Sequence, residues 1–190
     1  MKTGQIIIFS GPSGSGKTTL YKKALKDPQF RDRIFKITTV TTRSPREGEQ
    51  NGKDYIFISR EQFFHKERAG YFLESQKVFD NYYGTPKDRV QKMLWAGKNV
   101  LLCIDVKGAR AVSRQFPEAI KVFIKAASLS VLKKRIQKRG VGSKEDLDLR
   151  LKIARQELKE AKSYHYVVLN DNLKHCYKSL KVILQECLWG

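Results

Sequence analysis

Four short apolar segments recur along the chain, separated by longer segments with the spacing of amphipathic helices. The apolar segments are rich in β-branched residues: Ile6–Phe9, Val100–Ile104, Lys121–Ile124 and Tyr166–Leu169. Such continuous runs are typical of strands that are buried on both faces of a parallel sheet. The helical patterns cover Thr18–Lys26, Pro86–Ala96, Gly108–Gln115, Leu129–Lys138, Lys144–Lys162 and Leu173–Cys187. Strands that alternate with helices predict an α/β fold with ligands beyond the carboxyl ends of the strands.

Residues 34–80 interrupt this alternation. They contain shorter strand patterns over Phe35–Val40, Tyr55–Ile58 and Tyr71–Phe79. A helix is expected after Ser59, because Gln62 stands three positions later and can complete a capping box. The segment predicts a small insert of mostly antiparallel sheet.

Residues 126–163 are the second interruption. Two charged helical patterns flank Gly140-Val141-Gly142, and Ser143 is placed to begin the second helix. Glycines between two such helices are typical of a hinge, so this segment predicts a flap over a cleft.

The first apolar segment runs directly into a glycine-rich loop. Gly11, Gly16, Lys17 and Thr18 have the spacing of a P-loop, and the expected strand and helix flank them. In such a loop, backbone N–H groups and the positive end of the helix surround a phosphate. The lysine adds charge over the β and γ phosphates, and the threonine hydroxyl can bind Mg²⁺. The pattern predicts a nucleoside triphosphate site.

Length and composition are those of a globular chain. It has 190 residues, and 41% of them are apolar, which suffices for one packed domain. No run of 18 apolar residues exists, which argues against a transmembrane helix. The first predicted strand begins so early that we expect no signal peptide. Cys103, Cys176 and Cys187 lack metal-site or disulfide spacing, and we interpret them as reduced thiols of a cytoplasmic protein.

The formal net charge of +19 has more than one explanation. A nucleic-acid partner would account for it, but no nucleic-acid-binding motif accompanies the charge. We favour basic residues gathered around the sites of anionic substrates and on solvated helix faces. A generally basic proteome stays open as a third explanation.

A second anion site is predicted in residues 38–55. Arg43 and Arg46 flank Ser44-Pro45, and the proline stiffens the turn between the two guanidinium groups. Two guanidinium groups can bind a phosphate monoester bidentately, and Tyr55 can donate a further hydrogen bond. Taken alone, this segment would also fit a basic surface loop. Glu74 and residues 81–85 favour the binding site.

Six motifs in fixed order reinforce this interpretation. They are GPSGSGKTT (11–19), TTRSPREGEQNGKDY (41–55), FLE (72–74), NYYGTP (81–86), IDVKGA (104–109), and LKKR…RG…RL (132–151). With them the chain resembles the guanylate kinase family over nearly its whole length. The resemblance implies one domain over 1–190 with a P-loop three-layer α/β/α fold and a parallel central sheet. Its core would be 1–33, 97–125 and 164–190, with a GMP-binding insert over 34–96 and a helical lid over 126–163.

The resemblance also implies a reaction and its partners. The γ-phosphate of ATP would pass to GMP, giving ADP and GDP in purine nucleotide metabolism, with Mg²⁺ as cofactor. We expect ATP and GMP as partners, with dGMP as a further acceptor, and neither a membrane nor a nucleic acid. The protein would act in the cytoplasm as a monomer or homodimer. Two alternatives are a catalytically silent protein-binding module of the same fold and, suggested by charge alone, a nucleic-acid binder.

The family's site residues carry over onto matching positions of this chain. For ATP they are Gly11, Pro12, Ser13, Gly14, Ser15, Gly16, Lys17, Thr18, Thr19, Arg135, Arg139 and Asn170. For GMP they are Thr39, Arg43, Arg46, Tyr55, Glu74, Tyr83, Thr85, Asp105 and Arg150. Thr18 and Asp105 would bind the metal, directly or through water. Catalysis would rest on Lys17, Arg43, Arg139 and Arg150. An alternative for Arg135 is a charge on a solvated helix face. An alternative for Asn170 and Asp171 is a helix cap.

The predicted acceptor pocket has a chemical basis. A carboxylate such as Glu74 can accept both the ring N–H and the exocyclic amine of guanine, and the Thr85 hydroxyl can donate to its carbonyl. Adenine has an acceptor in place of that ring N–H, so the pocket would reject it on the order of 10⁴-fold.

Two positions depart from the family pattern. Many relatives have an acidic residue in place of Cys103 and glutamine in place of Lys107. Residues two apart on a strand share a face, so Cys103 is expected on the side of Asp105. The missing carboxylate and added cation predict weaker Mg²⁺ affinity with the chemistry retained.

Overall fold

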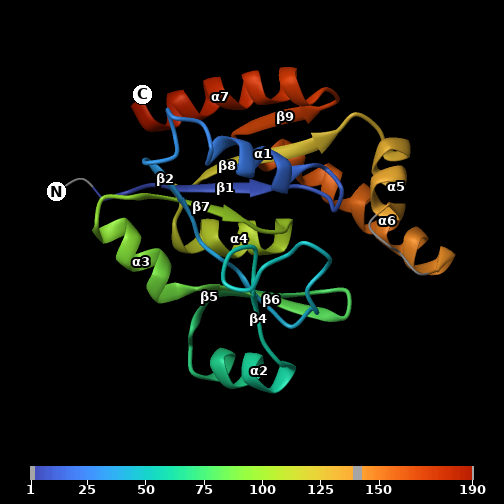
Figure 1. The fold of residues 1–190 in the computed structure, drawn as a ribbon, viewed down its shortest axis with the longest axis horizontal. Helices are drawn as coiled ribbons and strands as arrows, with labels where there is room; N and C mark the ends of the chain where they lie inside the picture. Colours follow the sequence, from blue (N-terminus) through green and yellow to red (C-terminus); the bar gives the residue numbers. More distant parts are fainter. Residues whose placement is uncertain (1–2, 139–142, 190) are drawn as a thin grey trace. The chain divides into compact units, whose positions relative to one another are not determined.

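The computed structural model describes residues 3–138 and 143–189 and has an α/β fold (Figure 1). Its larger sheet has the strand order β2-β7-β1-β8-β9. β2 pairs with β7, β1 with β8, and β8 with β9, all in parallel. The strand bounds are β1 Ile6–Ser10, β2 Ile34–Lys36, β7 Asn99–Cys103, β8 Ile120–Ala126 and β9 Tyr166–Asn170. The predicted parallel sheet is therefore confirmed.

A separate four-stranded sheet has the order β4-β3-β6-β5. Its strands are β3 Val40–Thr41, β4 Ile56–Phe57, β5 Phe72–Val78 and β6 Asn81–Pro86. β6 pairs antiparallel with β3 and with β5, whereas β3 and β4 are parallel. This small mixed sheet confirms the predicted insert architecture.

The chain divides into two compact units, which we name by their main feature. The P-loop unit comprises Ile7–Arg33, Cys103–Val106 and Ile120–Gly190, and the small-sheet unit comprises Met1–Ile6, Ile34–Leu102 and Lys107–Ala119. The helices of the P-loop unit are α1 Lys17–Ala24, α5 Leu129–Gln137, α6 Lys144–Lys159 with a following 3₁₀ turn η1 Glu160–Ser163, and α7 Leu173–Trp189. Those of the small-sheet unit are α2 Arg60–Arg68, α3 Lys87–Trp95 and α4 Val106–Gln115.

Local signals placed most of these elements correctly. The Ser59 hydroxyl accepts from the Gln62 N–H, and the Gln62 side chain accepts from the Ser59 N–H, which is the predicted capping box of α2. The Ser143 hydroxyl accepts from the Asp146 N–H and begins α6 as expected. The buried strand β1 and the longer helices also lie within a few residues of their predicted bounds.

Two strand predictions were wrong in detail. Residues 35–40 do not form one strand, because β2 belongs to the larger sheet and β3 to the small one. Residues 81–86 form β6, which the sequence analysis did not predict as a strand. Gly84 and Pro86 are both residue types that weaken a local strand signal. Glycine is needed there, because a Cβ at Gly84 would lie 2.6 Å from the Phe72 ring.

The buried residues of each unit explain its fold. All five residues of β1 are buried, as are Phe123 and Ile124 of β8. In the small-sheet unit the Phe63 ring of α2 stacks at 4.6 Å on the Phe72 ring of β5. Burial of such aromatic faces against a sheet is the main favourable term in forming these units.

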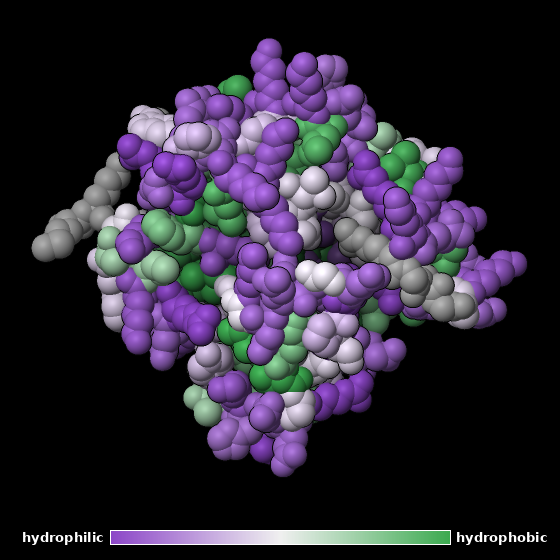
Figure 2. Space-filling view, viewed as in Figure 1, coloured by the Kyte–Doolittle hydropathy of each residue, from purple (hydrophilic) through white to green (hydrophobic). Residues whose placement is uncertain are grey.

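Hydrophilic side chains cover much of the face seen in Figure 2. This agrees with basic residues on solvated surfaces as one explanation of the net charge of +19. Within the described ranges, no helix has the length and apolar character needed to cross a membrane.

Candidate active site

The glycine-rich loop joins β1 to α1 in a backbone shape that only glycine tolerates. Gly11 and Gly16 have φ values of 130° and 100°, in the left-handed region. A Cβ at Gly11 would lie 2.2 Å from the Ile124 carbonyl oxygen, and a Cβ at Gly16 would lie 2.0 Å from Nδ2 of Asn170. Glycine is thus needed at Gly11, where the backbone of β8 leaves no room for a Cβ, and the left-handed φ favours glycine at Gly16 as well.

The N-terminus of α1 has features that favour the binding of an anion. The serines Ser59, Ser128 and Ser143 cap α2, α5 and α6, but no side chain caps α1, and its first turn contains no acidic residue. The first N–H groups of a helix need a partner, and a phosphate can supply it. The Lys17 ammonium donates to the carbonyl oxygens of Gly11 and, at 3.0 Å, Pro12, so it lies against the same loop.

Two polar side chains hold the loop from β9 and α5. Nδ2 of Asn170 donates to the Ser15 carbonyl oxygen at 2.7 Å, and the contact is buried. Arg135 donates to the carbonyl oxygens of Gly14 at 3.3 Å and Ser15 at 3.4 Å, and to that of Asn170 at 3.4 Å. Because these carbonyls are bound, the orientation of their peptide groups in the loop is fixed.

These contacts change two sequence interpretations. Arg135 is engaged with the loop backbone and is not merely a solvated helix charge. Asn170 contacts the loop as well, and the cap of α7 is Asn172, whose Oδ1 accepts from the N–H groups of Lys174 at 2.8 Å and His175 at 3.3 Å. Asn170 and Asp171 are therefore not the helix cap.

Asp105 follows β7 at the carboxyl end of the strand. The Ile104 N–H donates to the Phe9 carbonyl oxygen at 3.2 Å, so the chain leaves the sheet next to the end of β1. Burial raises the pKa of the Tyr164 hydroxyl to about 12, and the negative charge of Asp105 adds to this effect, while Ser10 opposes it. All three residues belong to the P-loop unit.

The strand ends at Cys103, which corrects one expectation. Because Asp105 lies outside the strand, the two-residue period does not place it on the face of the partly exposed Cys103. Thr18 and Thr19 are exposed in the first turn of α1.

The predicted lid contains α5 and α6, whose buried Leu132 and Ala154 share one apolar cluster with Ala126 at the end of β8. Nε of Arg150 lies 3.1 Å from both carboxylate oxygens of Asp146, one helical turn earlier. Arg139 and the glycines of 140–142 lie outside the described residues.

In the small-sheet unit, Glu74 and Thr85 are cross-strand partners on β5 and β6. The Thr85 hydroxyl donates to Oε1 of Glu74 at 2.6 Å, and both side chains are buried, with 7% of Glu74 exposed. Thr39, which precedes β3, is buried in the same unit. A carboxylate so enclosed is stabilised by hydrogen-bond donors, of which the Thr85 hydroxyl is one.

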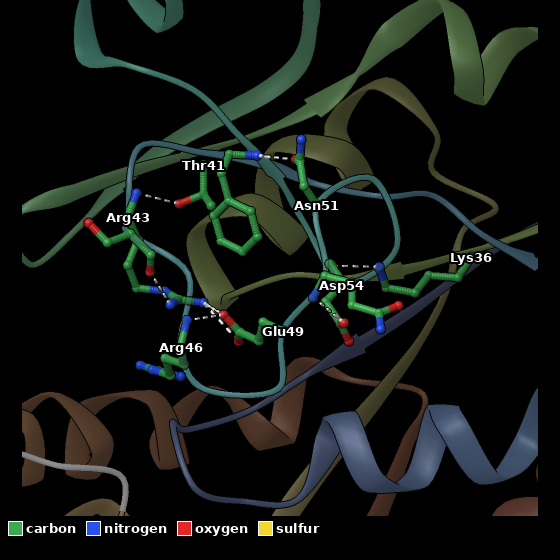
Figure 3. A network of polar contacts seen from close by, with 10 residues as sticks. Lys36, Thr41, Arg43, Arg46, Glu49, Asn51 and Asp54 are labelled. Carbon is green, nitrogen blue, oxygen red and sulfur yellow. Dashed lines mark hydrogen bonds and ion pairs between the residues drawn. The ribbon is translucent and has the colours of Figure 1, made fainter.

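Arg43 is held in place by Glu49, a residue that the sequence analysis did not single out (Figure 3). Nη2 of Arg43 donates to both Glu49 oxygens, at 2.9 and 2.8 Å, and Nη1 donates to the Ser44 carbonyl oxygen at 2.7 Å. The guanidinium lies 5.3 Å from the centre of the Tyr55 ring, and Tyr55 contacts the Tyr83 ring edge-on. The Arg46 side chain is exposed.

Comparison with known proteins decides the family. The family model described as guanylate kinase matches residues 3–187. The chain belongs to the guanylate kinase family. A curated guanylate kinase from Clostridium tetani is 43% identical over 184 residues, which cover 97% of this chain and 86% of the relative. One from Hahella chejuensis is 41% identical over 186 residues, which cover 97% of this chain and 88% of the relative.

The structural comparison agrees. The crystal structure of guanylate kinase from Anaplasma phagocytophilum matches with a TM-score of 0.79 and 28% identity, over 100% of this chain and 89% of that one. The resemblance stated from sequence motifs and the fold class are thereby confirmed. A guanylate kinase phosphorylates GMP with ATP, so this family member is an enzyme, an ATP:GMP phosphotransferase.

Within each unit, the structure brings together most residues that the sequence analysis named. The loop residues, Arg135 and Asn170 form one network in the P-loop unit. Glu74 with Thr85, and Arg43 with Tyr55 and Tyr83, do so in the small-sheet unit. The sequence analysis missed Glu49 and the buried Asp54, whose carboxylate accepts from the Gln50 N–H at 3.1 Å. The sequence signal that could have pointed to these two residues is the spacing of acidic residues around Arg43-Ser44-Pro45-Arg46.

Proposed function

We propose that the guanylate kinase reaction of this enzyme uses the P-loop residues for ATP and the small-sheet residues for GMP, without a covalent intermediate. The observation that carries the proposal is the buried Glu74–Thr85 pair, which holds a carboxylate acceptor in a fixed position inside the small-sheet unit. Such an acceptor matches the adjacent N–H donors of guanine. Catalysis of phosphoryl transfer depends mainly on positioning the reacting groups and stabilising charge in the transition state. The functional division would be an insert over 34–96 that binds GMP and a lid over 126–163.

The ATP phosphates would bind the loop of residues 11–19. Its glycines leave backbone N–H groups available, and the uncapped start of α1 adds positive potential. Lys17 now donates to carbonyls of the loop, and we propose that its ammonium moves onto the β and γ phosphates when ATP binds. Asn170 and Arg135 hold the loop carbonyls and thereby keep the N–H groups oriented.

The chemistry of the residues present fits Mg²⁺. Thr18 supplies a hydroxyl in the first turn of α1, and Asp105 a carboxylate at the end of β7. Over 3–138 and 143–189, no three His, Cys, Asp or Glu side chains gather as a metal cage. Mg²⁺ bound with a nucleotide needs only one or two protein oxygens, because phosphates and water complete its shell. When bound, the ion would neutralise phosphate charge.

The monophosphate would bind Arg43, Arg46, Tyr55 and Tyr83. Two unit charges about 4 Å apart repel by roughly 4 kcal/mol at an effective dielectric near 20, so the two substrates need cations between them. The guanine would bind Glu74, Thr85 and Thr39. Asp105 is proposed near the metal-bound nucleotide.

Arg139 and Arg150 are proposed to reach the transferring group when the lid closes. Arg150 would then exchange Asp146 for a phosphate, a change that its position one turn from Asp146 allows. Closure would also exclude water and suppress hydrolysis of ATP.

A coupled assay of ADP release with GMP, AMP, UMP and CMP, each tested separately, examines the acceptor site. We expect turnover with GMP, and equal activity with AMP would remove the role of Glu74. Lys17→Met is expected to lower kcat by on the order of 10²-fold or more. Lys26→Met, at an exposed position just beyond α1, is the matched control and should keep full turnover.

We also propose where the enzyme acts, its oligomeric state and its further partners. The enzyme would act in the cytoplasm, where both nucleotides are available, as a monomer or homodimer, and would accept dGMP as well as GMP. The basic charge would serve anionic substrates, and nucleic acid would not be a partner. A salt titration against oligonucleotides tests the last point.

A further inference from the structure

We propose that Glu49 is a positioning residue for the acceptor phosphate, in that its carboxylate fixes the Arg43 guanidinium in the orientation that receives the phosphate. The inference rests on the proposed role of Arg43 in GMP binding. Both Glu49 oxygens accept from Nη2 of Arg43, at 2.9 and 2.8 Å, in the network of Figure 3.

The carboxylate is itself anchored. One of its oxygens accepts from the Arg46 N–H at 2.9 Å, and the Glu49 N–H donates back to the Arg46 carbonyl oxygen at 3.0 Å. Glu49 is thus bound to the turn between the two arginines and cannot follow Arg43 if that side chain moves. Because the Glu49 carboxylate is fixed, it sets the orientation of the Arg43 guanidinium. A mobile ion pair would not do so.

The remaining surroundings of Arg43 enforce the same orientation. Its guanidinium lies 5.3 Å from the Tyr55 ring centre and 5.8 Å from that of Phe57, and only 12% of the side chain is exposed. Its Nε is buried without a hydrogen-bond partner in the part of the chain that the structure describes. An unsatisfied buried N–H is costly, so this orientation is imposed by the neighbours and does not maximise the hydrogen bonds of Arg43.

Electrostatics supports the assignment. Burial by itself raises the pKa of the Glu49 carboxyl, but the Arg46 N–H and the Arg43 guanidinium outweigh burial and lower that pKa below its ordinary value. Glu49 is therefore ionised at neutral pH. Because the pair is largely shielded from solvent, it is screened less than a surface pair.

Glu49→Gln tests the inference, with Glu47→Gln as the matched control at an exposed position of the same loop. Glutamine keeps the length of the side chain and an oxygen for the Arg46 N–H, but it loses the charge that fixes Arg43. The affinities for GMP and guanosine are measured by calorimetry or by competition. We expect Glu49→Gln to weaken GMP binding on the order of 10- to 100-fold, with guanosine affinity and the KM for ATP unchanged. Glu47→Gln should change none of these.

Several outcomes would overturn the inference. Equal or tighter GMP binding would make Glu49 a competitor of the phosphate, and a parallel loss of guanosine affinity would make it a mere support of the loop. If Glu49→Gln does not fold, Glu49→Asp replaces it, since aspartate keeps the charge but has too short a reach for both contacts. An unchanged ratio of GMP to guanosine affinity in Glu49→Asp would then contradict us.

Arg46→Gln separates this inference from the proposed function. If only Arg46→Gln weakens GMP binding, the role of Glu49 is refuted and the phosphate site stands. If neither Arg46→Gln nor Glu49→Gln weakens it, the phosphate site itself is wrong.

Discussion

The Thr85 hydroxyl donates a 2.6 Å hydrogen bond to the Glu74 carboxylate across neighbouring strands of the small sheet. Both side chains are buried, so the charge on Glu74 depends on donors within the fold. The pair holds the carboxylate in one orientation before any nucleotide arrives. A pre-oriented acceptor loses little further entropy on binding, which would favour selective recognition of guanine at the proposed site.

Replacing Glu74 by glutamine should therefore impair GMP binding. A glutamine presents one oxygen and an amide that opposes the guanine donors, so the KM for GMP should rise on the order of 10²-fold while that for ATP stays constant. Steady-state kinetics with each substrate varied measures both values. Glu61→Gln, at an exposed position of α2, is the control. An unaltered KM for GMP in Glu74→Gln would refute the assignment.

Asn170→Ala should weaken the binding of every triphosphate donor. The substitution removes the 2.7 Å bond to the Ser15 carbonyl oxygen and frees the loop. We expect the KM for ATP to rise about 10-fold, with the same factor for GTP as donor and no change for GMP. Asn172→Ala, which removes the cap of α7, should lower stability by about 1 kcal/mol and leave KM values unchanged.

A loss confined to ATP would contradict this role. It would show that Asn170 recognises the adenine base and does not act through the loop.

Asp27 should make stability depend on pH in the acid range. Burial alone would raise the pKa of its carboxyl, but the Gln29 N–H, the Tyr177 hydroxyl and the Lys181 ammonium outweigh burial and lower it. A lowered folded-state pKa contributes stability that is fully present above the ordinary pKa of an aspartate and is lost as pH falls below that pKa and through the lower folded value.

Urea unfolding of Asp27→Asn measures this contribution. The variant should be less stable than the natural chain at pH 7 by about 1 to 3 kcal/mol, and the difference should shrink near the acid limit. Asp32→Asn, at a side chain that is 81% exposed, should change stability little at either pH. A difference for Asp27→Asn that does not vary with pH would exclude titration of Asp27 as its cause.

Cys103→Asp should strengthen Mg²⁺ binding. Cys103 ends β7 two residues before Asp105, and a carboxylate there would add negative charge near the proposed metal site. We expect the midpoint of a Mg²⁺ titration of activity to fall a few-fold, roughly 3- to 10-fold, with little change in kcat at saturation. Lys107→Gln, at the second departure from the family pattern, should act in the same direction. An unchanged midpoint in Cys103→Asp would show that the thiol position does not influence the metal.

Prediction from the sequence succeeded where the signal lies within a few residues. The loop from Gly11 to Thr18 and the caps at Ser59 and Ser143 depend on neighbouring backbone groups, so their spacing alone was informative. Residues 81–86 show the opposite case. Gly84 and Pro86 disfavour a strand locally, and β6 exists because β3 and β5 pair with it on both sides.

The amino-acid order by itself determined the alternating architecture, the glycine-rich loop and the residue types available at the two proposed nucleotide sites. Only the tertiary structure decided which partner each of these residues contacts. It divided residues 35–40 between two sheets, brought Asn170 to a carbonyl 155 positions away, and set Glu49 against Arg43. The physical reason is that helix caps and glycine turns are satisfied by adjacent backbone, whereas sheet pairing and buried polar contacts depend on how the whole chain packs.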